Sequence, residues 1–208
     1  MTDRLPTGVN VLDRHLDGGI PRGSVVQFEA DPASQSELLL YELTAARGTL
    51  YLSTVRSESA VMDAFDSARG RVGNPTVRDV GGDAPLDAVN RLVGTLPEGA
   101  NLIVDVLDPL ERMDSGRFRR FLTELQTTMV NTGSVAFLHC MKGGTEPENR
   151  TMTRHVADVV WDLRTTVRGT DVVNHLAVPK FRGGRALDET IKLKLEETVT
   201  IDTSRDIA

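Results

Sequence analysis

The turn from Ala30 to Glu37 lies where this chain could bind a phosphate group. The apolar stretch from Ser24 to Ala30 predicts a strand before it, and the apolar spacing from Ser34 to Arg47 predicts a helix after it. A phosphate-binding turn at such a junction needs glycines, so that backbone amides can approach the phosphates. It also needs a lysine for the outer phosphates and a serine or threonine hydroxyl for Mg²⁺.

None of these groups stands at its expected place. Ala30 and Gln35 occupy the two glycine positions, Ser36 the lysine position and Glu37 the position of the hydroxyl. The missing ammonium removes a contact worth about 1.5–3 kcal/mol, while Asp31 and Glu37 add charge that repels a polyphosphate. Asp31 instead suits a helix N-terminus, which it would cap. ATP with Mg²⁺ is therefore a disfavoured ligand, no cofactor is expected, and we predict an ordinary capped turn formed by Ala30, Asp31, Pro32, Ala33, Ser34, Gln35, Ser36 and Glu37.

A second chemical group ends the apolar run from Asn101 to Val106. This run predicts a central parallel strand, and Asp105 lies at its end. A carboxylate there either takes part in a nucleotide site or serves as a hydrogen-bond acceptor for the neighbouring loop. Both interpretations stay open at the level of the sequence.

The segment from Thr7 to Ala30 resembles the entry segment of the RecA/KaiC-like ATPases. In addition, NLIVDVLDPL resembles the Walker B strand of that family with Asp105 at its acidic position, and HVADVVWDL and VPKFRGG resemble its late strands. The likeness extends over nearly the whole chain and is strongest to archaeal single-domain KaiC/GvpD-like proteins. It implies a RecA-like fold in which residues 1–208 form one domain. It rests on Thr7, Gly8, Leu12, Asp13, Gly18, Gly19, Ile20, Pro21 and Gly23.

The departures from this family decide the functional hypothesis. The family carries glutamates after its second core strand, where they activate the attacking water, but here Val55 and Arg56 stand at those positions. Neither can accept a proton at neutral pH. With the altered turn, the phosphate cradle, the Mg²⁺ hydroxyl and the base are all replaced. We expect a non-catalytic pseudo-ATPase that acts as a regulatory or scaffolding module through protein contacts, in signalling or transcriptional regulation.

Two other functions remain as alternatives. One is a weak or unconventional ATPase. The other is an accessory protein of DNA repair similar to recombinase paralogues, for which the basic cluster of Arg117, Arg119 and Arg120 would contact DNA. A solvated helix face explains the same cluster without a ligand.

Lys180 and Arg182 are candidates for a contact with a partner. In ring assemblies of the resembled family, a Lys-x-Arg at this place reaches the phosphate of a neighbouring subunit, so the resemblance implies an active family member or a second copy as partner. Residues two apart on a strand share one face. The alternative is a pair of solvated charges that protect an edge strand from aggregation.

The composition narrows the class of protein. The chain of 208 residues has a formal net charge of −6, which argues against a nucleic-acid partner. It contains 20 Arg but only 4 Lys, and 18 Asp against 12 Glu, which indicates a haloarchaeal, high-salt cytoplasm or a GC-rich genome. Cys140 is the only cysteine, so no intrachain disulfide forms. Without an apolar leader or span, we expect a cytoplasmic protein with no membrane contact.

These groups must be positioned by an α/β fold. Apolar runs alternate with amphipathic stretches up to about residue 156, and β-rich segments follow. This order predicts a RecA-like, mostly parallel sheet flanked by helices, with C-terminal antiparallel strands at its edge. The expected strands are 24–30, 49–54, 76–80, 101–106 and 134–140, and the expected helices 34–47, 57–69, 86–96, 115–131 and 151–156.

Overall fold

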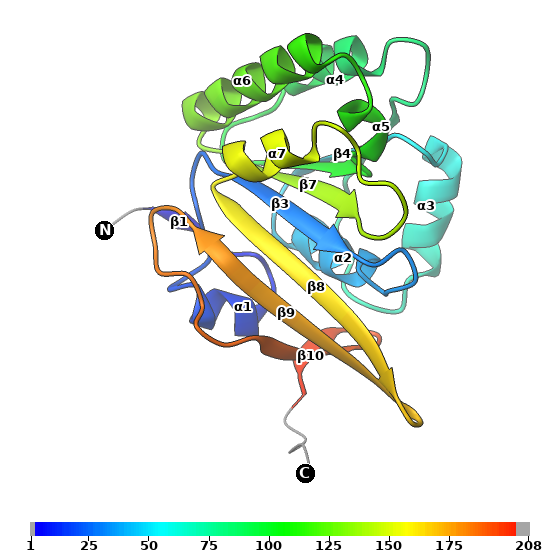
Figure 1. The fold of residues 1–208 in the computed structure, drawn as a ribbon, viewed down its shortest axis with the longest axis vertical. Coiled ribbons are helices and arrows are strands. Elements are labelled where there is room, and N and C mark those ends of the chain that lie inside the picture. Colours follow the sequence, from blue (N-terminus) through cyan, green and yellow to red (C-terminus); the bar gives the residue numbers. More distant parts are fainter. Residues whose placement is uncertain (1–2, 203–208) are drawn as a thin grey trace.

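The computed structural model describes residues 3–202, which build a nine-stranded sheet in the order β11-β10-β9-β8-β3-β7-β6-β4-β5 (Figure 1). Six strands run parallel, and three antiparallel strands extend the sheet beyond β8. This confirms the predicted fold class. The parallel strands are β3 (Val25–Ala30), β4 (Thr49–Ser53), β5 (Thr76–Asp79), β6 (Asn101–Asp105), β7 (Val135–Met141) and β8 (Val159–Arg168), and the antiparallel ones are β9 (Asp171–Phe181), β10 (Ile191–Leu195) and β11 (Val199–Ile201).

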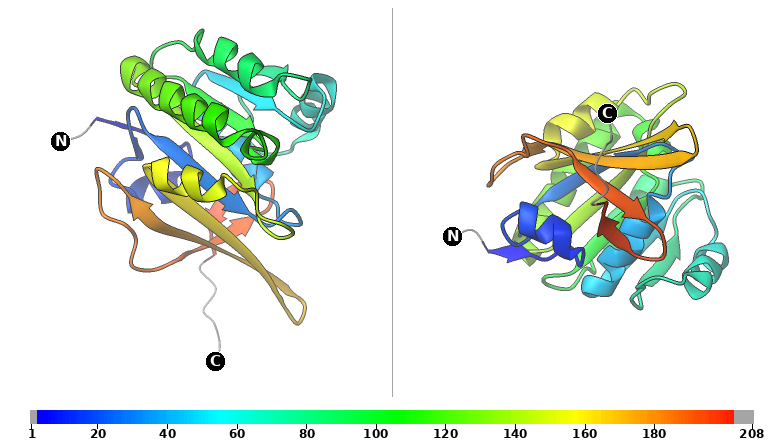
Figure 2. Two further views of the ribbon diagram at one scale, coloured as in Figure 1. Left: turned by 45° about the horizontal axis from the view of Figure 1, so that its top comes forward. Right: turned by 90° about the horizontal axis from the view of Figure 1, so that it is seen from below.

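Helices cover both faces of this sheet (Figure 2). Side chains alternate across a strand, so Phe28 joins the core on one face and Val25 the core on the other. The first core receives α1 (Asn10–His15), α2 (Glu37–Ala46) and α3 (Glu58–Ser67). The second receives α4 (Pro85–Val93), α5 (Asp108–Glu111), α6 (Ser115–Thr132) and α7 (Arg150–Val156).

The entry segment that carried the family resemblance has a structural role. The Thr7 backbone N–H and hydroxyl both donate to Asp13 Oδ1, at 2.7 and 2.8 Å. Gly19 has a φ of 120°, and a Cβ there would lie 2.2 Å from the Leu5 carbonyl oxygen. Only glycine fits this close approach, which allows β1 (Arg4–Leu5) to pair with β2 (Ile20–Pro21).

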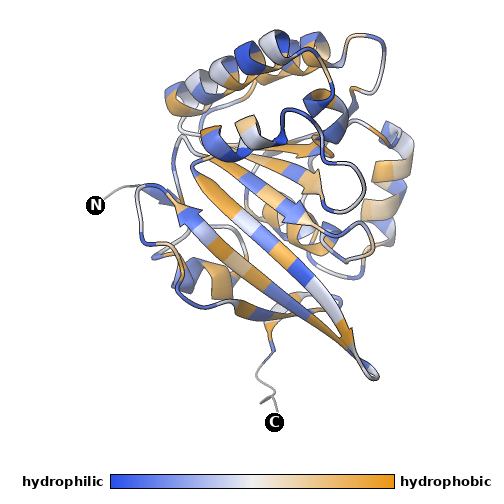
Figure 3. Ribbon diagram, viewed as in Figure 1, coloured by the Kyte–Doolittle hydropathy of each residue, from blue (hydrophilic) through white to orange (hydrophobic). Residues whose placement is uncertain are grey.

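The hairpin of β8 and β9 extends beyond the rest of the sheet (Figure 1). Both strands carry apolar and polar stretches (Figure 3), and buried residues alternate with less buried ones from Asn174 to Val178 of β9. At its tip Val167 pairs with Val172, and both are largely exposed. The hairpin therefore has a covered base and an apolar tip.

The fold brings several strand ends to one edge. The strands β3, β7, β6 and β4 are parallel neighbours, so their carboxyl ends lie side by side. The helix α2 begins after β3 at this edge, and the segment with Val55 and Arg56 follows β4. Crevices at the carboxyl ends of strands are the usual place of ligand sites in open α/β sheets.

Candidate functional site

The turn between β3 and α2 is closed by its own hydrogen bonds. Asp31 Oδ1 accepts the Ala33 N–H at 2.8 Å, and the Asp31 carbonyl accepts the backbone N–H and the hydroxyl of Ser34. The predicted strand-to-helix turn is present, but α2 begins at Glu37 rather than Ser34. The expectation that Asp31 caps this helix is wrong: Ser36 is the N-cap residue, and its side chain makes no capping bond. Asp31 forms an Asx turn with the Ala33 N–H instead, because α2 begins only at Glu37, too far along the chain for Asp31 to be its N-cap residue.

Asp105 is buried at the end of β6 and accepts hydrogen bonds from three side chains. Tyr51 Oη donates to its Oδ2 at 2.6 Å, and His139 Nδ1 lies 2.7 Å from its Oδ1. The third donor is Arg56, whose Nη2 lies 2.7 Å from Oδ2. The register explains the meeting, since Asp105 pairs with Ser53 of β4 and with His139 of β7. Asp105 is thus a hydrogen-bond acceptor, with two donors on the neighbouring strands, Tyr51 and His139, and one, Arg56, in the loop that follows β4.

Arg56 joins Asp105 to the first turn of α2. Its Nη1 lies 3.0 Å from Glu37 Oε1, while its backbone N–H donates to Ser53 Oγ at 3.0 Å. Thr54, two residues before Arg56, ties this segment to the end of β6, because its backbone N–H donates to the Asp105 carbonyl. The Arg56 guanidinium therefore lies between the carboxylates of Glu37 and Asp105.

The charges of the cluster are held firmly at neutral pH. Burial alone would raise the pKa of Asp105, but His139, Tyr51 and Arg56 together lower it to about 2. Burial would lower the pKa of Arg56, and Asp105, Tyr51 and Glu37 outweigh it and raise that pKa. Burial also raises the pKa of Tyr51 well above its ordinary value. An ionised Asp105 that already accepts three hydrogen bonds and a protonated Arg56 are poorly suited to exchange protons with a substrate.

A hollow of about 350 Å³ opens over this cluster. It is lined by Glu37, Arg56 and Asp105 on its polar side and by apolar side chains on the other. Val55 stands at its rim and is 70% exposed. The apolar lining consists of Val55, Val106 and Met141.

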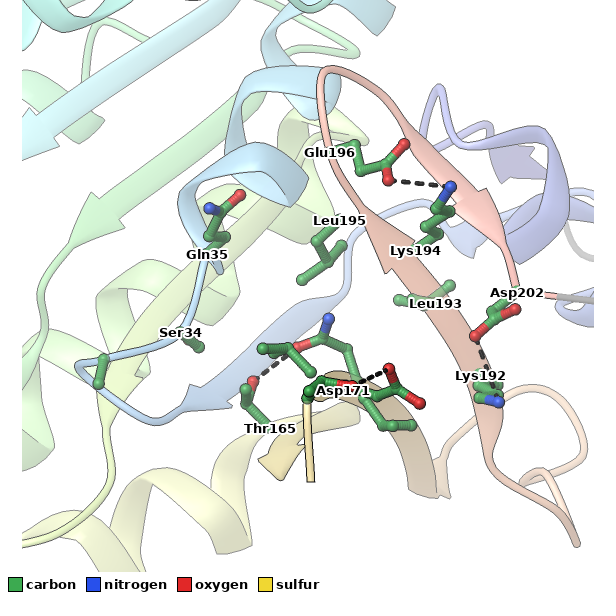
Figure 4. A pocket seen from close by; sticks show the side chains of 15 residues that line it. Ser34, Gln35, Thr165, Asp171, Lys192, Leu193, Lys194, Leu195, Glu196 and Asp202 are labelled. Carbon is green, nitrogen blue, oxygen red and sulfur yellow. Dashed lines mark hydrogen bonds and ion pairs between the residues drawn. The ribbon is translucent and has the colours of Figure 1, made fainter. Parts of the chain in front are cut away.

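A larger hollow of about 740 Å³ lies elsewhere, between the turn at 33–35, the β8–β9 hairpin and β10 (Figure 4). Four of its charged groups form two pairs: Lys194 Nζ lies 2.9 Å from Glu196, and Lys192 Nζ lies 3.2 Å from Asp202. A fifth, Asp171, accepts a hydrogen bond from the Thr170 hydroxyl. Asp105 and Arg56 do not line it. Size alone therefore does not mark this hollow as the site.

Lys180 and Arg182, the predicted partner contacts, lie beside the C-terminus of α7. Lys180 Nζ donates to the carbonyls of Arg154 and His155 at 2.7 and 3.0 Å. Arg182 donates to the carbonyls of His155 and Val156 and pairs with Asp158. These are carbonyls that a helix end leaves without a partner within the helix.

The remaining sequence candidates do not join the cluster. Arg117 pairs with Asp87 at 2.9 Å on the outer surface, while Arg119 and Arg120 are exposed. Cys140 is buried. Over residues 3–202, no group of three His, Cys, Asp or Glu side chains converges as metal ligands would. Within the same residues, no helix has the length and apolar character needed to cross a bilayer.

The sequence analysis singled out Arg56 only because it stands where the resembled family has a glutamate, and it did not predict the contacts of Arg56 with Asp105 and Glu37. The signal was present, because Arg56 lies two residues after one predicted strand, 49–54, and Asp105 lies at the end of another, 101–106, in the same parallel sheet. His139 and Tyr51 were missed because each lies inside an apolar run where a polar atom gives no periodic signal.

The fold is similar to that of a solved archaeal protein. The crystal structure of KaiC-like protein PH0186 from Pyrococcus horikoshii OT3 matches with a TM-score of 0.74 and 14% identity, covering 96% of this chain and 100% of that one. At this identity the likeness establishes the fold alone. No curated protein matches the chain. The model of a family of unknown function (DUF7125) matches residues 4–208, and the chain belongs to that family.

Proposed function

We propose that this protein is a pseudo-ATPase: a non-catalytic RecA/KaiC-like domain, formed by residues 1–208, that acts through contacts with other proteins. The observation that carries the proposal is the Arg56 guanidinium, which lies 2.7 Å from Asp105 and 3.0 Å from Glu37. A cation of the protein itself therefore stands between the carboxylates nearest to where a nucleotide's metal would bind.

Mg²⁺ fits these residues poorly. It requires near-octahedral oxygen ligands at about 2.0–2.1 Å. Asp105 already accepts from Tyr51, His139 and Arg56, and Glu37 replaces the hydroxyl with a carboxylate that pairs with Arg56. Entry of the metal would have to displace a guanidinium whose charge both carboxylates stabilise.

A polyphosphate fits the turn no better. The Asp31 carboxylate occupies the Ala33 amide and so takes the role that a bound anion would have. Ser36, at the lysine position, is buried. A triphosphate would meet the carboxylates of Asp31 and Glu37 and no neutralising lysine.

The other functions have less support. A weak ATPase would need Arg56 to leave both of its partners and would still have no base at Val55 or Arg56. A DNA-binding accessory role would depend on the cluster at 117–120, in which Arg117 already pairs with Asp87. We propose a regulatory role in a cytoplasm of high salt. One candidate for the partner is an active family member or a second copy of this chain, contacted through Lys180 and Arg182.

Phosphate release from ATP with Mg²⁺ tests the catalytic half of this proposal. The purified chain is expected to release no more phosphate than Asp105→Asn, with an active P-loop ATPase as positive control. Turnover that Asp105→Asn abolishes would overturn the proposal.

A further inference from the structure

We infer that the hollow at Val55 is a docking site for a basic protein segment that inserts an apolar side chain beside Val55, Val106 and Met141. This inference rests on the proposed function and names the chemistry of the partner. Two observations carry it, one on apolar surface and one on charge.

The apolar observation concerns Val55. It is 70% exposed at the rim of the 350 Å³ hollow, and Val106 and Met141 line the interior beside it. Thr54 is buried, its N–H donates to the carbonyl of Asp105 and its hydroxyl donates to the carbonyl of Val106, so the backbone that presents Val55 is fixed. An apolar side chain on a fixed rim, next to an apolar hollow, has the form of a protein-docking pocket.

The charge observation concerns the edge around this hollow. The ends of parallel strands and the starts of the following helices gather carboxylates there, and those of Glu37 and Glu58 lie in the first turns of α2 and α3, where the helix dipole favours a negative charge. Four basic side chains among them form ion pairs: Arg56 with Glu37 and Asp105, Arg78 with Glu58, Lys142 with Asp162, and Arg154 with Glu29 and Glu146. A fifth, the exposed Arg112, donates to the Thr145 carbonyl. Of the exposed carboxylates, Glu37, Glu58 and Glu146 are paired in this way. Four others lie in no ion pair among the described residues and give this edge its negative charge: Asp31, Asp79, Asp83 and Glu148.

Together these features select one class of partner. A negatively charged surface repels nucleic acid and phosphate and attracts lysine and arginine side chains. A segment that combines such side chains with an aliphatic residue satisfies both the carboxylates and the hollow. Charge would steer the encounter, and the inserted side chain would hold the complex.

An NMR titration tests the inference with two matched probes. We would add Ac-KKLLKK-NH₂ or Ac-EELLEE-NH₂ to the ¹⁵N-labelled chain in about 50 mM salt, where charge is weakly screened. The basic peptide is expected to shift the amide signals of Val55, Arg56, Val106 and Met141, and the acidic one to leave them unchanged.

Two variants with similar exposure give the control. Val55→Ser is expected to lower the affinity for the basic peptide about 5-fold, because roughly one buried methyl contact or more is lost. Val167→Ser, which removes a valine that is 72% exposed on the hairpin tip, is expected to leave the affinity unchanged.

The inference is overturned by equal losses in the two variants, by shifts confined to other surfaces, or by the absence of any binding. It is also overturned if sedimentation shows a dimer that Val55→Ser dissociates, because the occupant is then a second copy. None of these results requires ATP to bind, so they are distinguishable from a failure of the pseudo-ATPase proposal.

Discussion

The Arg56 guanidinium lies 2.7 Å from the carboxylate of Asp105, although Arg56 follows β4 and Asp105 ends β6. Its other nitrogen pairs with Glu37, so one side chain connects the ends of β4 and β6 to the start of α2. The Arg56 side chain thereby holds this edge of the sheet together.

Replacing Arg56 is expected to destabilise the fold. Arg56→Ala leaves the buried Asp105 without its charged donor, and a lost hydrogen bond of this kind is worth about 1.5–3 kcal/mol. Urea unfolding at pH 7 measures the change. Arg78→Ala, which breaks the exposed pair with Glu58, is the matched control and should lower the unfolding free energy by less than about 1 kcal/mol. Equal losses in the two variants would contradict the buried role of Arg56.

Tyr51→Phe is expected to show a defect that depends on pH. It removes the donor 2.6 Å from Asp105 and should lower the unfolding free energy by about 1–3 kcal/mol at pH 7. The folded pKa of Asp105, about 2, lies below the ordinary unfolded value, so the ionised carboxylate stabilises the fold above about pH 4 and loses that effect as the pH falls toward 2. The difference in unfolding free energy between wild type and Tyr51→Phe should therefore become smaller as the pH falls. A gap that stays constant from pH 7 to 2 would show that the hydroxyl does not act through Asp105.

Glu42→Gln is expected to stabilise the protein at neutral pH. Glu42 is buried on α2, and burial raises its pKa despite the Val199 N–H and Arg71. A raised folded pKa means that stability is lost as the pH rises through the unfolded and then the folded value, so the ionised side chain is unfavourable at pH 7. Thermal unfolding should give Glu42→Gln a higher midpoint at pH 7 and no advantage below about pH 4. The exposed Glu124→Gln is the control, and a lower midpoint for Glu42→Gln at pH 7 would refute the prediction.

Much of the fold could be predicted from the sequence because its elements are long enough to show a period. The 18-residue α6 lies where apolar residues recur with the 3.6-residue period of a helix, and β6 lies where the apolar run is continuous. Ser57 caps α3, as predicted, by accepting the Ala60 N–H. The helices α1 and α5 and the pair β1–β2 were missed, since two to six residues are too few to show a period. The partners of Asp105 depend on strand order, which brings Tyr51 and His139 together from β4 and β7.

Lys180 and Arg182 are expected to stabilise α7 within their own chain. Both donate to carbonyls at its C-terminus, where a cation contributes about 0.3–1 kcal/mol. Lys180→Ala with Arg182→Ala should speed hydrogen exchange over 150–156, while Lys194→Ala, which breaks an exposed pair with Glu196, should not. Unchanged exchange together with the loss of an assembly would assign the two residues to a partner instead.

The central claim is that Arg56, Glu37 and the closed turn leave no place for a magnesium nucleotide. Calorimetric titration of the wild-type chain with ATP and Mg²⁺ tests it most directly, with Asp105→Asn titrated in parallel. The account predicts no binding tighter than about 1 mM for either protein, a limit near 4 kcal/mol of binding free energy. Micromolar, magnesium-dependent binding by the wild type that Asp105→Asn abolishes would contradict it.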